Sequence, residues 1–147
     1  MVVHEGAEGG CAKRSVSDDF PSTALTIEMW MRGTHRNSYF ETLVSYGVAS
    51  VNNAMFLAID ERTEPPTRRD QLSLYVSGSA CHSGVSSNVL DGAWHHVAVT
   101  WSSADGATVF FRDGATLATK TCHTGEHIPT GGCLVLAQEM DAVTAES

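Results

Sequence analysis

The sequence has no long apolar run and few cations. The densest apolar segment, Met55–Ile59, is only as long as a strand, whereas a membrane-spanning helix needs roughly 20 such residues. Lysine and arginine number 9 against 17 aspartates and glutamates, for a net charge of −8. A surface of this sign repels phosphate backbones and anionic membranes. We therefore expect neither nucleic-acid binding nor membrane insertion.

Several catalytic and targeting motifs are also missing. No Gly-x-Ser-x-Gly elbow and no phosphate-binding loop occurs. No basic-then-apolar leader follows Met1, so the leader of a secreted form would have been removed or lie upstream. No ten-residue window has a helical period, and no internal repeat is visible. With 147 residues, 42% of them apolar, the chain (1–147) is long enough for one globular domain with its own core.

The cysteines lack the close spacing of zinc ligands. They are Cys11, Cys81, Cys122 and Cys133. An even set of this kind favours two disulfides formed in an oxidising compartment, with four buried thiols as the alternative. Of the three pairings, we favour Cys81–Cys122 with Cys11–Cys133. If the thiols were reduced, the neighbouring histidines would offer a His–Cys metal cluster, although their spacing argues against one.

The clearest structural pattern is the segment Trp94–Gly114. Within His96–Trp101, alternate side chains face opposite sides, as in a β-strand. The Asp-Gly pairs Asp105–Gly106 and Asp113–Gly114 stand between apolar runs, which is a strong hairpin signal because both residue types tolerate positive φ. His95 precedes His96 directly, so the two imidazoles face opposite sides and cannot share one metal. The segment predicts antiparallel β-structure.

Short alternating segments recur along the chain between Gly, Asp and Pro turns. Many short strands at regular spacing predict a sandwich or a barrel. The predicted strands are Leu25–Arg32, Glu41–Tyr46, Ala54–Ile59, Gln71–Ser77, Ala80–Val85, His96–Trp101, Thr108–Arg112, Thr116–Cys122 and Cys133–Gln138. The predicted core residues include Leu25, Ile27, Met29, Leu72, Leu74, Val76, Val97, Val99, Val109 and Phe111.

Three segments together resemble one family. They are WHHVAVTWSSADGATVFFRDG at Trp94–Gly114, LVLAQEMD at Leu134–Asp141 and LTIEMWMR at Leu25–Arg32. The first is similar to the core hairpin of laminin G-like and pentraxin domains, and the second to the strand and calcium loop of pentraxins. The third is similar to an early strand of these domains. The resemblance implies an all-β, antiparallel jelly-roll β-sandwich of the concanavalin A-like, laminin G-like class.

A calcium site is predicted from two acidic residues and from the resemblance. Glu139 and Asp141 are two apart on an extended segment, so their carboxylates point the same way, with the Met140 carbonyl between them. The resemblance implies that an Asp-Asn pair from an earlier loop completes a pentraxin site. Asn52 and Asn53 stand at the matching positions, with one formal charge fewer. We expect one weakly bound calcium ion; the alternative is two solvated acids at a strand end.

The chain departs from pentraxins in two respects. The resemblance places a pentraxin disulfide at the positions of Glu28 and Ala98, and neither is a cysteine here, so pentraxin-specific assembly is not implied. The chain also stops at Ser147, before the closing strand that such domains usually have. We therefore expect a fragment of a longer extracellular chain, with a sheet edge or core face that something else covers.

The aromatic and acidic residues bear on ligand binding and catalysis. Trp94 and Trp101 lie in the hairpin that resembles the family core, and the resemblance implies that they pack inside. Trp30 lies on a polar face and is a candidate for stacking on a sugar; the alternative is a half-exposed sheet residue without a ligand. Some glucanases of the superfamily carry E-x-D-x-x-E, and here Thr144 stands in place of the second glutamate. A retaining glycosidase needs that second carboxyl group, so no enzyme is expected.

The expected function is non-catalytic recognition. We predict an extracellular or cell-surface module that binds a glycan or a protein, with calcium as the expected cofactor. The alternative is a structural assembly domain within a larger cell-surface or matrix protein.

Overall fold

The computed structural model describes residues 13–15, 19–35, 40–49, 51–60 and 70–137. The regular structure in these ranges is entirely β, so they contain no helix able to cross a membrane. The strands are β1 (Lys13–Ser15), β2 (Ala24–Thr34), β3 (Phe40–Val48), β4 (Val51–Asp60), β5 (Gln71–Val76), β6 (Ser79–His82), β7 (Asp91–Ser102), β8 (Ala107–Arg112), β9 (Ala115–Thr121) and β10 (Cys133–Leu136).

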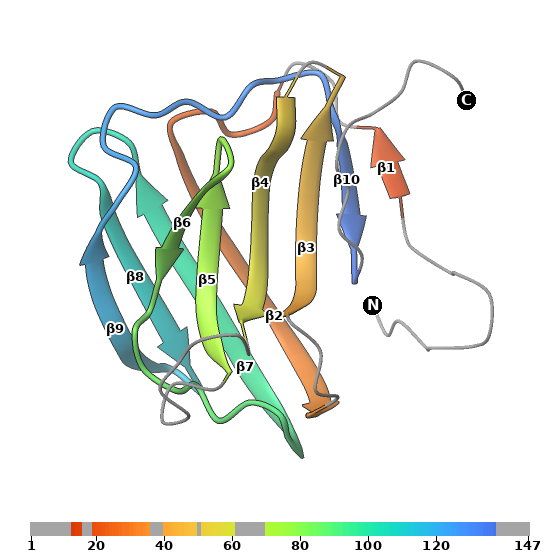
Figure 1. Cartoon of the computed structure of the whole chain (residues 1–147), viewed down its shortest axis with the longest axis vertical. Coiled ribbons are helices and arrows are strands. Elements are labelled where there is room, and N and C mark those ends of the chain that lie inside the picture. The colour runs from red at the N-terminus through yellow and green to blue at the C-terminus, as the bar shows by residue number, and fades with distance from the viewer. Residues whose placement is uncertain (1–12, 16–18, 36–39, 50, 61–69, 138–147) are drawn as a thin grey trace.

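The strands form two antiparallel sheets packed face to face (Figure 1). The larger sheet has six strands in the order β1-β10-β3-β4-β5-β6, and the smaller has four in the order β2-β7-β8-β9. Non-consecutive neighbours such as β10 and β3, or β2 and β7, show that the chain crosses between the sheets. The predicted all-β, antiparallel jelly-roll sandwich is confirmed.

The predicted hairpin forms the centre of the smaller sheet. Asp113 and Gly114 both have positive φ, 51° and 79°, as the tightest hairpin turns require. Gly106 has φ 72°, and a Cβ there would collide with the Thr124 side chain and the Cys122 carbonyl. These turns therefore need the small or left-handed-tolerant residues that the sequence places there.

The core lies between the sheets and is confirmed for most of the predicted residues. Leu72, Leu74, Val76, Val97 and Val99 are completely buried. Leu25 is also buried, while Ile27 and Met29 are half-buried and pack against the same cluster. The apolar alternation of the predicted strands therefore identified the core-facing side of β2, β5 and β7.

On β8 the predicted core face is wrong. Phe110 is fully buried, whereas Val109 and Phe111 lie half-buried on the other side of the strand. The register explains this, because Phe110 pairs with the core residue Val99 and cross-strand partners share a face. Apolar residues occupy both faces of β8, so its alternation alone leaves the choice open.

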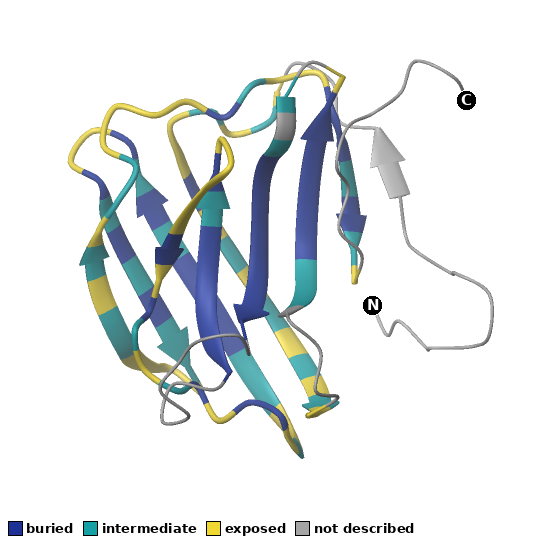
Figure 2. Ribbon diagram, viewed as in Figure 1, coloured by how far each residue is buried: buried dark blue, intermediate teal, exposed yellow. Residues whose placement is uncertain are grey.

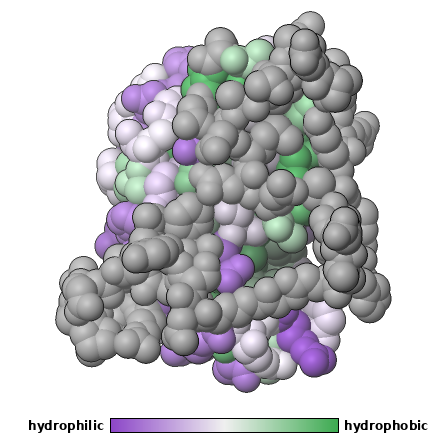
Figure 3. Space-filling model, turned by 45° about the vertical axis from the view of Figure 1, so that its right-hand side comes forward, coloured by the Kyte–Doolittle hydropathy of each residue, from purple (hydrophilic) through white to green (hydrophobic). Residues whose placement is uncertain are grey.

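The middle of the larger sheet is buried on both faces. Met55, Leu57 and Ile59 of β4 join the core, yet the alternating Phe56 and Ala58 are also buried (Figure 2). The Phe56 ring stacks on Tyr75 of β5 at a centroid distance of 4.0 Å. In an antiparallel sheet with one solvated face, Phe56 and Ala58 would be exposed to water. In the view of Figure 3, hydrophilic residues show at the upper left and along the lower edge of the molecule, and hydrophobic ones show toward the top and right.

The larger sheet has β1 at one edge and β6 at the other. β10 is an internal strand, because β1 pairs with it on the side away from β3. The sequence did not predict β1, which has only three residues. The described edge beside β10 is therefore closed by this chain itself. The prediction that a further strand comes from elsewhere stays a prediction.

Candidate functional site

The predicted calcium residues Asn52 and Asn53 lie within β4, not in the connection predicted between Tyr46 and Ala54. β3 continues to Val48 and β4 begins at Val51. The pairing shifts between Tyr46↔Met55 and Val48↔Val51, so three residues of β4 face one of β3 in a bulge. Asn53 lies in this bulge with φ 53°, a left-handed conformation that asparagine tolerates.

The bulge leaves a polar atom of Asn53 unsatisfied. The side-chain oxygen Oδ1 is buried and accepts no hydrogen bond, although its backbone carbonyl accepts one from Gly78 N at 3.2 Å. A buried amide oxygen without a donor is costly, and amide oxygens are ligands that Ca²⁺ uses. Asn53 therefore fits the predicted cation.

The other predicted ligands are not placed. Glu139, Met140 and Asp141 lie outside the described residues, as does Thr144, and so does the Asn52 side chain. Within the described ranges, no group of three or more His, Cys, Asp or Glu residues has the geometry of a metal site. The structure thus describes the side chain of one predicted ligand, Asn53, and the calcium site as a whole stays a prediction.

One predicted disulfide is present. Cys81 of β6 bonds to Cys122, which directly follows β9. Because β6 and β9 are edge strands of the two sheets, the bridge ties the sheets together along one side. Both sulfur atoms form the disulfide, so neither is available as a thiolate ligand. The alternative His–Cys metal cluster around them is therefore wrong. Cys133 is buried at the start of β10, while Cys11 lies outside the described residues, so the pairing Cys11–Cys133 stays a prediction.

A serine, a histidine and an aspartate meet on the larger sheet. Ser73 Oγ lies 2.8 Å from His82 Nδ1, and Asp60 Oδ2 lies 3.8 Å from the same nitrogen. A catalytic triad needs the hydroxyl and the carboxylate on opposite ring nitrogens, and Ser73 is completely buried. This arrangement lacks the geometry for nucleophilic catalysis.

His95 is held between two carboxylates at one end of the smaller sheet. Its Nδ1 lies 2.8 Å from Asp113 Oδ2 and its Nε2 lies 3.0 Å from Asp91 Oδ1. The bond to Asp113, and then that to Asp91, raises the pKa of His95 above its usual value. The hydrogen bond with His95, and then the one from the backbone N–H of His96, lowers the pKa of Asp113. A hydrogen bond from the backbone N–H of Ala93 lowers the pKa of Asp91. The network fastens the start of β7 to the β8–β9 turn.

The outer face of the smaller sheet carries two exposed tryptophans. Trp30 on β2 is 66% exposed and Trp94 on β7 is 55% exposed. The prediction of a packed Trp94 is therefore wrong, while that for Trp101 is confirmed, since Trp101 is buried. Alternation from Val97 and Val99 places Trp94 on the side opposite the core, a signal that the hairpin resemblance outweighed.

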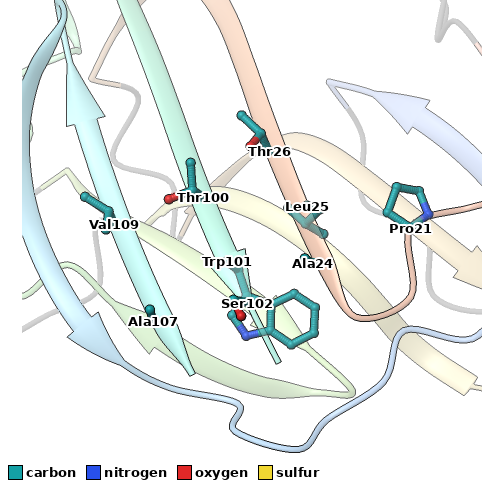
Figure 4. A pocket seen from close by; sticks show the side chains of 9 residues that line it. All are labelled: Pro21, Ala24, Leu25, Thr26, Thr100, Trp101, Ser102, Ala107 and Val109. Carbon is teal, nitrogen blue, oxygen red and sulfur yellow. The ribbon is translucent and has the colours of Figure 1, made fainter. Parts of the chain in front are cut away.

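The same outer face continues into an open depression of about 500 Å³ (Figure 4). Thr26, Thr100 and Val109 line it and are cross-strand neighbours on β2, β7 and β8. Small side chains and hydroxyl groups dominate its lining. The lining residues are Pro21, Ala24, Leu25, Thr26, Thr100, Trp101, Ser102, Ala107 and Val109.

The two positions of the pentraxin disulfide also lie on this face. Glu28 of β2 and Ala98 of β7 are directly opposite each other in the ladder. Cross-strand neighbours are the geometry that the resemblance implied for those positions. Here the pair separates the tryptophans from the depression.

Comparison with known proteins agrees with this architecture. A family model described as the concanavalin A-like lectin/glucanases superfamily matches residues 6–145. The rat protein "Sushi, von Willebrand factor type A, EGF and pentraxin domain-containing protein 1" is 35% identical over 119 residues, which are 80% of this chain and 3% of that protein. The chain spans about a quarter or less of the length of the curated relatives it matches.

Two solved structures share the fold. The heptameric SAP-like pentraxin of Limulus polyphemus aligns with a TM-score of 0.65 at 20% identity, covering 89% of this chain and 65% of that one. Domains LG4-5 of the mouse laminin alpha1 chain align with a TM-score of 0.63 at 16% identity, covering 94% and 35%. The chain therefore belongs to the concanavalin A-like lectin/glucanases superfamily, and its sandwich is of the pentraxin and laminin G type.

Proposed function

We propose that this domain is an extracellular, non-catalytic recognition module that binds a glycan with the help of calcium at the β4 bulge. The observation that carries the calcium site is the buried, unpartnered Oδ1 of Asn53. The Cys81–Cys122 disulfide supports an oxidising compartment. The missing acid at Thr144 and the geometry around Ser73 support a role without catalysis.

In this proposal five residues hold one calcium ion. The side chains of Asn52, Asn53, Glu139 and Asp141 and the Met140 carbonyl supply its oxygens. Bound calcium would offer coordination positions to sugar hydroxyls or to a carboxylate. Glu139 and Asp141 supply only two formal negative charges, so the site should be weak. Its dissociation constant for calcium should lie in the range of about 0.1–1 mM that is found in extracellular modules.

Calorimetric titration of calcium into the EDTA-treated chain tests the site. Asn53→Ala removes the oxygen and should weaken binding about tenfold, whereas Asn53→Asp adds a charge and should tighten it. Asn88→Ala is the matched control, because Asn88 is an exposed asparagine with a nearly equal φ of 51°. Both alanine variants carry the same backbone strain. No heat at millimolar calcium, or equal affinity in Asn53→Ala and wild type, would contradict the proposal.

The second candidate function is assembly within a larger protein. It rests on the small fraction of each curated relative that this chain spans. A glycan array with and without EDTA separates the two functions. Sugar binding that chelation abolishes supports calcium-assisted recognition, and the absence of sugar binding favours assembly.

A further inference from the structure

Two exposed tryptophans lie side by side on the outer face of the smaller sheet. Trp30 is directly opposite His96 in the β2–β7 ladder, and Trp94 is directly opposite Arg32. Because Trp94 and His96 are two residues apart, the tryptophans are diagonal neighbours, with Cα atoms about 7–8 Å apart. Both tryptophans lie on paired strands, so the position of neither ring depends on a loop.

The side chains around the tryptophans are polar. The Trp30 ring packs edge-on against His96 at a centroid distance of 5.4 Å. His96 Nε2 in turn lies 3.7 Å from Glu28 Oε2, and the Glu28 side chain is 69% exposed. Arg32 is exposed beside Trp94. Each ring therefore has a hydrogen-bonding neighbour, and the charges of Glu28 and Arg32 balance.

This combination matches one ligand chemistry. Aromatic faces pack against the apolar C–H face of a pyranose ring, while a carboxylate, an imidazole and a guanidinium bind its hydroxyl groups. Glutamate is depleted at the core of protein interfaces, whereas here Glu28 lies against the His96 ring that contacts Trp30. The balanced local charge and the net charge of −8 disfavour an anionic ligand.

We propose that the outer face of β2 and β7 binds a neutral oligosaccharide by stacking it on Trp30 and Trp94, without calcium. Toward the other end of β2, the hydroxyl groups of Thr26 and Thr100 at the open depression extend the polar surface along the same face. This site is distinct from the calcium position, because Asn53 belongs to the other sheet.

The surface is preorganised at the Trp94 end. The Asp91–His95–Asp113 network fastens the start of β7, and Asp113 Oδ1 also accepts a hydrogen bond from His96 N at 2.9 Å. Residues 95 and 96 are thus fixed on both sides of the strand. Rigid aromatic platforms lose little entropy when a ligand binds.

The test is a screen of neutral glycans in the presence of EDTA, followed by titration of the best binder. Trp30→Ala and Trp94→Ala should each weaken binding about tenfold, and Trp30→Phe should retain part of it. Val85→Ala is the control, since Val85 is also an exposed apolar side chain, at 42%, outside this face. Thermal melts establish that every variant is folded.

Three results would overturn the proposal. They are the absence of any neutral glycan that binds, binding that EDTA abolishes while the tryptophan variants leave it unchanged, and self-association that Trp30→Ala abolishes. The second would assign sugar binding to the calcium edge and the third would assign this face to a second copy. Binding in EDTA that depends on both tryptophans would support the stacking site whether or not the calcium proposal holds.

Discussion

The disulfide between Cys81 and Cys122 should account for a large part of the stability of this domain. It closes a loop with a sequence separation of 41 residues. In the chain-entropy model, a loop of 41 residues removes about 13 cal/mol/K from the unfolded state, or about 4 kcal/mol at 25 °C. Folding stabilities of single domains are only about 5–15 kcal/mol. Loss of this one bridge should therefore lower the melting temperature by about 8–16 °C.

The perturbation is reduction of a variant in which no other bridge can form. Cys11→Ala with Cys133→Ala leaves only Cys81 and Cys122, and oxidised and reduced samples then have the same amino-acid sequence. Equilibrium unfolding in urea, followed by tryptophan fluorescence, gives the free energy of unfolding of each form. The oxidised form should be more stable by about 4 kcal/mol.

Two results would refute this reasoning. One is a difference below about 1 kcal/mol between the oxidised and reduced forms, which would mean that the bridge constrains the unfolded chain far less than the loop length requires. The other is the titration of two thiols in the unfolded, unreduced variant, which would show that the bond does not form.

The remaining predictions concern the β8 face and the His95 network. Phe110→Ala should lower the free energy of unfolding by about 3–5 kcal/mol, because Phe110 is fully buried in the core, whereas Phe111→Ala on the outer face should cost clearly less; equal losses in urea titrations would contradict the register. The raised pKa of His95 means that its contribution to stability is complete below pH 6.5 and is lost as the pH rises through the raised value. The lowered pKa values of Asp91 and Asp113 mean that theirs is complete above pH 3.8 and is lost as the pH falls through the lowered values. The melting temperature of wild type should therefore fall relative to that of His95→Gln as the pH moves well above or well below the range from 3.8 to 6.5. A constant difference in melting temperature between the two proteins from pH 3 to 9 would argue against the network.

The strands themselves follow from local sequence. Period-2 alternation in segments such as Leu25–Arg32 and Gln71–Ser77, together with the Asp-Gly turns, was sufficient to predict nine of the strands. The choice of a sandwich over a barrel came from the resemblance to laminin G-like and pentraxin domains. These signals act between residues close in the chain, so they need no knowledge of distant contacts. The three-residue β1 has no such pattern and was missed.

Which side of a strand is buried, and which side chains become neighbours, depended on tertiary structure. Which side of β8 is inside was decided by its register with β7, because Val109 and Phe111 compete with Phe110 as core residues. The position of Trp94 beside Trp30 likewise follows from pairing between β2 and β7, strands that are far apart in the chain.

The chemistry of the domain divides in the same way. The sequence by itself determined an all-β fold and an even set of cysteines, and it supplied Asn52, Asn53 and residues 139–141 as predicted oxygen ligands, which stay a prediction. The sequence favoured Cys81–Cys122 among three possible pairings, and the tertiary structure decided it. Only the tertiary structure decided that a bulge buries the Asn53 oxygen and that His95 lies between Asp91 and Asp113. The reason is physical: alternation and turn residues specify a strand locally, whereas each of these contacts joins segments that come together only when strands pair and the two sheets pack.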